Sequence, residues 1–143
     1  MLEATSQELR KACLRNAKAA GALQGAHGSC RGILVFYSVE CGLKSLIMDD
    51  RGEKSSKTVG PKFGHNIRSL IAEARISAAE LGLVANAAIS IPTIRHGSGG
   101  QEISFSDVHT AWRYGVSLEA AGELAATAFL DSLVSALRKR LTT

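Results

Sequence analysis

The sequence has few of the residues and patterns that define secreted, metal-binding or membrane proteins. Its three cysteines include no Cys-x-x-Cys pair and no zinc-ligand spacing, so neither a disulfide framework nor a zinc site is predicted. We expect reduced, largely buried thiols in a cytoplasmic protein. The first residues lack the basic and apolar segments of a signal peptide. No window approaches the roughly 18 continuous apolar residues of a membrane helix, so no membrane partner is predicted.

Motifs of several enzyme classes are also absent. The sequence has no Gly-x-x-x-x-Gly-Lys-[Ser/Thr] loop for phosphates, no Gly-x-Gly-x-x-Gly after a strand and no His-Glu-x-x-His pair for zinc. No paired carboxylates stand out as a general acid and base. We therefore predict no cofactor and no metal, while enzymatic activity stays open.

The composition favours one helical domain. Aromatic residues make up only 5% of the 143 residues, and alanine and leucine dominate the apolar set. Small and unbranched side chains favour close-packed helices over a sheet sandwich. The fractions of hydrophobic (45%) and charged (21%) residues are ordinary for a folded protein, so residues 1–143 are predicted to form a single domain. The net charge of +4 suits an anionic partner such as a nucleic acid.

Apolar periodicity predicts an all-α fold, an up-and-down bundle of four to five helices. Thr5 and Glu8 fit a capping box at the start of the first helix. The second helix is apolar nearly all round, which is typical of a central helix. Residues 138–140 are basic and lie in the last turn of the last helix, where the helix dipole favours positive charge; contact with RNA is the alternative role of this basic cluster. The first predicted helix begins at residue 5 and ends between residues 21 and 28. The other predicted helices span about residues 29–48, 65–82, 106–114 and 117–140.

Two segments between the predicted helices are irregular. Residues 49–63 are polar and contain Pro61, so a mobile loop is predicted there. Its lysines and arginine can touch phosphates, although a solvated loop is the simpler interpretation. Pro92 disfavours a helix just before it. Within residues 87–105, the segments before and after the glycine-rich turn are predicted to pair as a short hairpin.

Two charges lie inside the apolar second helix. Glu40 and Lys44 are four residues apart, so their side chains can meet on one helix face. Charges are rarely placed in such a helix unless they pair, bind or specify something. Two interpretations remain open: an ion pair at the boundary of the core, or a polar patch at a cleft or dimer face.

A second polar constellation lies in the short helix near residue 110. His109 and Arg113 are again four apart, and Trp112 and Tyr114 flank the arginine. An arginine beside aromatic rings can hold a phosphate while a base stacks. Alternatively, Trp112 anchors the helix in the core and Arg113 bonds carbonyls of a neighbouring loop. His65 begins the third predicted helix, where it either joins a site or hydrogen-bonds a loop carbonyl.

Two of these elements together resemble a known family. Residues 36–46 (Phe-Tyr-Ser-Val-Glu-Cys-Gly-Leu-Lys-Ser-Leu) are followed about twenty residues later by residues 64–70 (Gly-His-Asn-Ile-Arg-Ser-Leu). The pair resembles the signature of HEPN domains, the small helical "higher eukaryotes and prokaryotes nucleotide-binding" family, over about residues 5–140. The resemblance implies a homodimer that binds RNA, a nucleotide or a larger protein partner, in a bacterial antiviral defence or toxin–antitoxin-like system. The residues expected at the ligand or dimer interface are Tyr37, Glu40, Lys44, Trp112, Arg113 and Tyr114.

Ribonucleases of this family characteristically carry an arginine followed four to six residues later by a histidine. No histidine of this sequence has such an arginine, so the resemblance implies a binding module. The alternative is a metal-independent endoribonuclease with a site built from distant residues, in which His65 and His109 serve as acid and base and Arg113 holds the phosphate. A third interpretation is a purely structural helical subunit of a larger complex.

Overall fold

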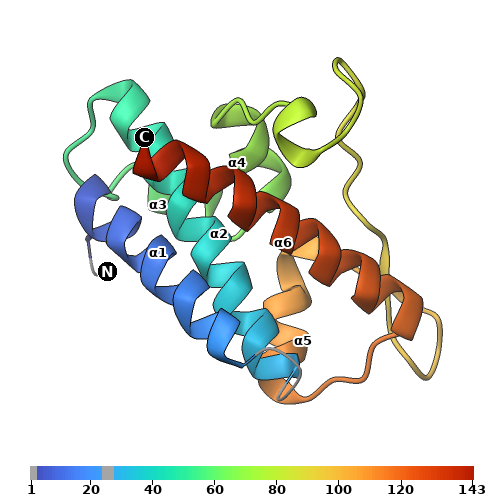
Figure 1. The fold of residues 1–143 in the computed structure, drawn as a ribbon. Helices are drawn as coiled ribbons and strands as arrows, with labels where there is room; N and C mark the ends of the chain where they lie inside the picture. Colours follow the sequence, from blue (N-terminus) through green and yellow to red (C-terminus); the bar gives the residue numbers. More distant parts are fainter. Residues whose placement is uncertain (1–2, 24–27) are drawn as a thin grey trace.

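The computed structural model describes residues 3–23 and 28–143, and within them the chain is mostly helical (Figure 1). The helical class predicted from the sequence is confirmed. The described residues form six α-helices, two short 3-10 helices and one two-stranded sheet. In chain order these are α1 (Ser6–Ala22), α2 (Gly28–Arg51), α3 (Val59–Phe63), α4 (Ile67–Glu73), η1 (Ala79–Leu81), β1 (Ile94–Arg95), β2 (Glu102–Ile103), η2 (Phe105–Asp107), α5 (Val108–Tyr114) and α6 (Ala120–Thr142).

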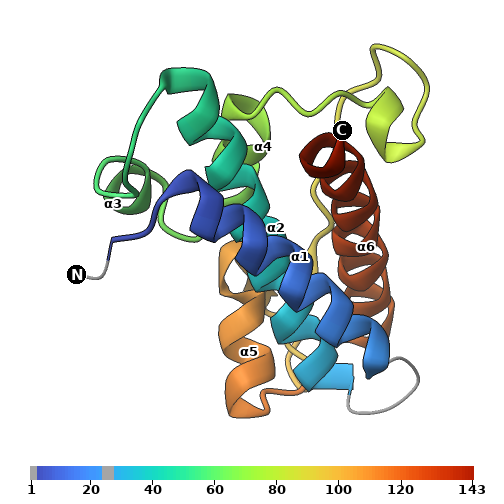
Figure 2. The same cartoon turned by 60° about the vertical axis from the view of Figure 1, so that its left-hand side comes forward.

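The core is built around α2, which contacts all five other α-helices. Both views show α5 beside the N-terminal half of α2 and α3 and α4 beside its C-terminal end (Figures 1 and 2). The fully buried side chains of α2 include Phe36, Val39, Leu43 and Ile47. The nearly continuous apolar surface of this helix therefore has a partner on most sides, as expected of a central helix.

Two glycines of α2 allow its neighbours to approach closely. A Cβ atom at Gly32 would lie 2.7 Å from Cε3 of the buried Trp112 ring on α5. A Cβ atom at Gly42 would lie 2.8 Å from Sγ of Cys13 on α1 and 3.0 Å from Cδ1 of Leu137 on α6. Both positions are therefore needed for close packing of the helices that surround α2.

Local signals in the sequence place the starts of two helices. The predicted capping box is present: Thr5 Oγ1 accepts from the Glu8 amide at 3.1 Å, and Glu8 Oε1 accepts from the Thr5 amide at 3.0 Å. Asn66 caps α4 by accepting from the Ser69 amide at 3.1 Å. α1 ends at Ala22, and the later part of the range predicted for its end includes residues 24–27, outside the described residues.

The third predicted helix is shorter than expected. It ends at Glu73 instead of near Gly82, and Arg75 adopts a left-handed backbone with φ of 57°. The cause is tertiary, because Arg140 of α6 donates hydrogen bonds to the carbonyl oxygens of Ala74 (3.2 Å) and Arg75 (2.8 Å). Arg140 also forms two hydrogen bonds of 2.7 Å with the carboxylate of Glu80. This arginine thus has a structural role at the end of α6.

Three other features differ from the sequence prediction. The described residues contain six α-helices rather than four or five, partly because the predicted loop 49–63 includes α3, held by the buried side chains of Val59 and Phe63. The sheet pairs Ile94 with Ile103 and Arg95 with Glu102, so the predicted hairpin exists only as two-residue strands closer to the turn. Residues 87–92 remain outside it.

α6 carries a membrane-compatible signal. By length and composition it could cross a membrane, with a mean hydropathy of 1.3 over its most apolar window. Only 28% of that window is buried in the described structure, and Leu124 is exposed on it. The sequence lacks a long continuous apolar run, and for that reason no membrane partner was predicted. The hydropathy of α6 does not decide this point, so it stays a prediction.

Candidate functional site

Five polar residues from three separate segments meet beside the middle of α2. Glu40 and Lys44 come from α2, His65 from the turn before α4, and His109 and Arg113 from α5. α2 contacts both α4 and α5, which brings these segments together. We refer to these five residues as the polar cluster. The sequence singled out all five, but only the fold joins them into one group.

Glu40 is the buried centre of the polar cluster. One carboxylate oxygen, Oε2, accepts from Lys44 Nζ at 3.3 Å, and the other, Oε1, is hydrogen-bonded to Nδ1 of His65. Glu40 and Lys44 are only 8% and 9% exposed. The pair therefore lies at the boundary of the core, which is one of the two interpretations left open by the sequence; a cleft or dimer face at this position stays a prediction.

His65 is held by Glu40 but reaches solvent. Its side chain is 51% exposed, whereas the carboxylate that it contacts is almost fully covered. When Nδ1–H donates to a carboxylate, the neutral ring keeps its lone pair on Nε2. The glutamate thus orients the imidazole, whose exposed edge suits His65 either as a base or as a contact for an anion.

His109 is the buried histidine of the polar cluster, 3% exposed. Its ring centroid lies 4.5 Å from that of His65 and 4.6 Å from that of Phe36. Burial, together with the nearby His65, lowers the pKa of His109 below its usual value. The ring is therefore neutral at pH 7, and its Nδ1 can accept a hydrogen bond from Nη2 of Arg113 at 3.4 Å.

Arg113 and Tyr114 form the solvent-exposed rim of the polar cluster. The Arg113 guanidinium carbon lies 5.4 Å from the centre of the exposed Tyr114 ring. Tyr37 is partly buried, with its ring centroid 5.7 Å from that of His109. An exposed guanidinium next to an exposed aromatic ring can contact a phosphate and a base of one strand.

Trp112 points away from the polar cluster. Its ring is buried against Gly32, and its Nε1–H donates to Oε2 of Glu123 on α6 at 2.8 Å. Of the residues expected at the interface, Trp112 is therefore the aromatic anchor that fixes α5, which is the structural alternative considered for it.

The apolar walls of the site were not predicted from the sequence. Phe36 lies against His109, and Phe105 of η2 lies beside Phe36 with ring centroids 6.5 Å apart. Phe105 also meets Phe129 of α6 edge-on at 5.8 Å. No motif marks these phenylalanines, although Phe36 is next to Tyr37 in the sequence. They exclude water from one side of His109 and so contribute to its lowered pKa.

The polar cluster can bind an anion through Arg113 and His65, and its imidazole groups can transfer protons. Within residues 3–23 and 28–143, no group of three or more His, Cys, Asp or Glu side chains could hold a metal ion. Comparisons of the chain with protein-family models, curated proteins and solved structures gave no match. Function is therefore inferred from the residues of the polar cluster.

Proposed function

We propose that this chain is a HEPN-like module that binds RNA through the exposed edge of the polar cluster. The observation that carries the proposal is that two solvent-exposed side chains are held by buried partners that lie close together. His65 is hydrogen-bonded to Glu40, Arg113 is hydrogen-bonded to His109, and the two imidazole rings are in contact. Arginine and protonated histidine both donate charge-assisted hydrogen bonds to phosphate oxygens. Because both side chains are held in place, little conformational entropy is lost when they bind an anion.

Tyr114 supports RNA over a free phosphate as the ligand. Its ring is exposed and lies beside the guanidinium of Arg113, where a base could stack while the arginine holds the adjacent phosphate. Stacking of this kind tolerates any base, so binding with little sequence preference is expected. The burial of His109 favours binding over catalysis, because only one imidazole of the cluster is open to a substrate.

The test is the binding of a fluorescently labelled single-stranded RNA, followed by anisotropy in buffer containing a chelator. Arg113→Ala should weaken binding by about tenfold and reduce the slope of log affinity against log salt by about 1, as expected for one lost phosphate contact. Arg15→Ala is the matched control, because Arg15 is exposed on α1 and belongs neither to the polar cluster nor to the basic residues 138–140. Equal binding by wild type and Arg113→Ala would overturn the proposal.

A specific observation favours a second function, metal-independent RNA cleavage. The imidazole rings of His65 and His109 are 4.5 Å apart, and Arg113 adjoins them. One histidine would take the proton of the 2′-hydroxyl as its oxygen attacks phosphorus, and the other would protonate the leaving 5′-oxygen. The products would be a 2′,3′-cyclic phosphate and a 5′-hydroxyl end. Incubation of end-labelled RNA without metal, analysed on a denaturing gel beside His65→Ala, distinguishes cleavage from binding.

The homodimer also belongs to this proposal. The exposed apolar residues of α6, such as Leu124, offer surface for a second copy. Sedimentation equilibrium of the purified chain tests this directly. A monomer that does not bind RNA and co-purifies with another protein would instead favour the structural-subunit interpretation.

The proposed function also includes a biological setting. We propose a role in a bacterial defence or toxin–antitoxin-like system and a cytoplasmic location for the chain.

A further inference from the structure

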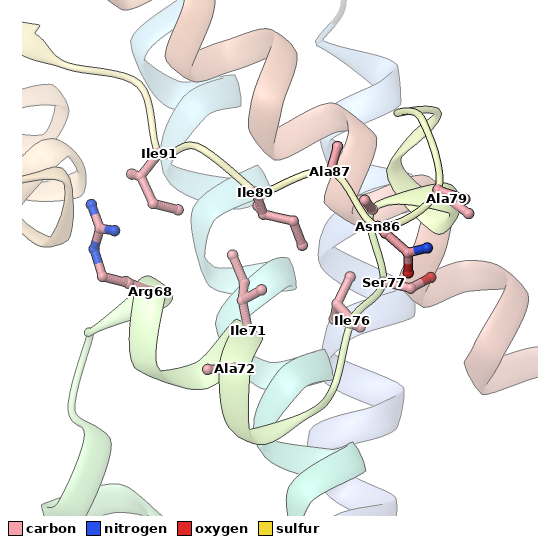
Figure 3. Close-up of a pocket in the computed structure, with 12 residues that line it drawn as sticks. Arg68, Ile71, Ala72, Ile76, Ser77, Ala79, Asn86, Ala87, Ile89 and Ile91 are labelled. Atoms are coloured by element: carbon pink, nitrogen blue, oxygen red, sulfur yellow. The ribbon is translucent and has the colours of Figure 1, made fainter.

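A groove of about 610 Å³ lies along α4, apart from the polar cluster. Its lining comes from α4, from the turn that follows it and from residues 85–91 (Figure 3). A volume of this size lies within the range of small-molecule sites. None of the five residues of the polar cluster lines the groove, so a ligand there would be independent of the proposed RNA site.

The long walls of the groove are apolar and face each other. Ile89 and Ile91 project into it from the extended segment, and Ile71 and Ile76 project from the opposite side (Figure 3). Ser90, between the two isoleucines, is exposed. This alternation is typical of an extended chain with one face on an apolar surface. In the described structure that face is only partly covered, because Ile89 and Ile91 stay partly exposed.

One end of the groove carries a single cation. Arg68 of α4 is exposed and lines both this groove and an adjoining pocket that includes Glu102. Among the described residues, Arg68 makes no ion pair and no side-chain hydrogen bond; other exposed arginines, such as Arg95, do bond within the chain. An unpaired guanidinium at the end of an apolar groove complements one negative charge on an apolar chain.

We propose that this groove binds an amphipathic carboxylate, with its alkyl chain between the isoleucines and its carboxylate on Arg68. A monoanion is favoured because one guanidinium is present and the acidic Glu102 lines the pocket beside it. The wall from Ala87 to Ile91 is about 13 Å long when extended, which suits an alkyl chain of medium length.

The experiment is calorimetric titration of the full chain with decanoate, below the concentration at which it forms micelles. Wild type should bind decanoate, and Arg68→Gln should bind it at least about tenfold more weakly, because the charge-assisted hydrogen bonds are lost. Arg138→Gln, the same substitution at an exposed α6 site outside the groove, should bind like wild type. Retained affinity in Arg68→Gln overturns the proposal.

Two further arms separate a built site from a generally apolar surface. Decyltrimethylammonium has the same tail and the opposite charge, so it should bind at least about tenfold more weakly than decanoate. Ala87→Trp places a large ring in the groove at an exposed position and should abolish binding, while circular dichroism confirms that the variant is folded. Equal binding of both surfactants, or full binding by Ala87→Trp, contradicts the assignment. RNA affinity is expected to be unchanged in Ala87→Trp, so the two proposals fail separately.

Discussion

Replacement of Glu40 by alanine should destabilise the protein by about 3 kcal/mol. The substitution removes the carboxylate that accepts from Lys44 Nζ at 3.3 Å and also holds His65. Lys44 is 9% exposed, so its ammonium group would remain largely buried without a partner. Loss of one member of a buried ion pair costs about 3–5 kcal/mol, and the partial solvent access here puts the value at the lower end. Urea denaturation followed by circular dichroism measures the change.

A double variant identifies the origin of this loss. If the penalty comes from the stranded ammonium group, Glu40→Ala with Lys44→Met should recover about 1–2 kcal/mol relative to Glu40→Ala alone. A Glu40→Ala loss below about 1 kcal/mol would mean that the pair behaves as an exposed salt bridge, and the description of the cluster as buried would be wrong. A double variant no more stable than Glu40→Ala would show that Lys44 is not the stranded charge.

Three other predictions concern packing and pH. Gly32→Ala should cost about 1–3 kcal/mol in urea denaturation because its Cβ meets the Trp112 ring, whereas Gly21→Ala, with open space around its Cβ, should be neutral or slightly stabilising. Hydrogen bonds from Arg140 lower the pKa of Glu80 to about 2. Wild type should therefore be more stable than Glu80→Gln by about 1–2 kcal/mol above pH 5. This difference in the free energy of unfolding should vanish as the pH falls from 4.5 towards 2. In an NMR titration the His109 ring should take up its proton below pH 6.5, so its contribution to stability, present above that pH, is lost as the pH falls.

The pairs within the polar cluster could be predicted from sequence, but their assembly could not. Spacing of four residues is enough to place Glu40 beside Lys44, and Arg113 beside His109, on one helix face. Nothing local indicates that α5 lies against the N-terminal half of α2, or that the turn before α4 brings His65 between them. That arrangement depends on the close approach allowed by Gly32, whose role becomes visible only when its neighbour is known.

The errors in the predicted helix boundaries also have tertiary causes. Residues 74–76 contain neither glycine nor proline, so periodicity alone continued the third helix to Gly82. The helix ends early because the distant Arg140 satisfies carbonyl groups there. Conversely, the polar composition and Pro61 predicted a loop over residues 49–63, yet proline is compatible with the first turn of a helix, and burial of Phe63 stabilises α3.

An NMR titration of isotope-labelled protein with a short single-stranded RNA tests directly whether the polar cluster binds RNA. We expect chemical-shift changes to concentrate at His65, Arg113 and Tyr114, with His109 responding through its contacts. Changes confined to the lysines of residues 54–62, or no changes at saturating RNA, would show that the polar cluster is not the RNA-binding site.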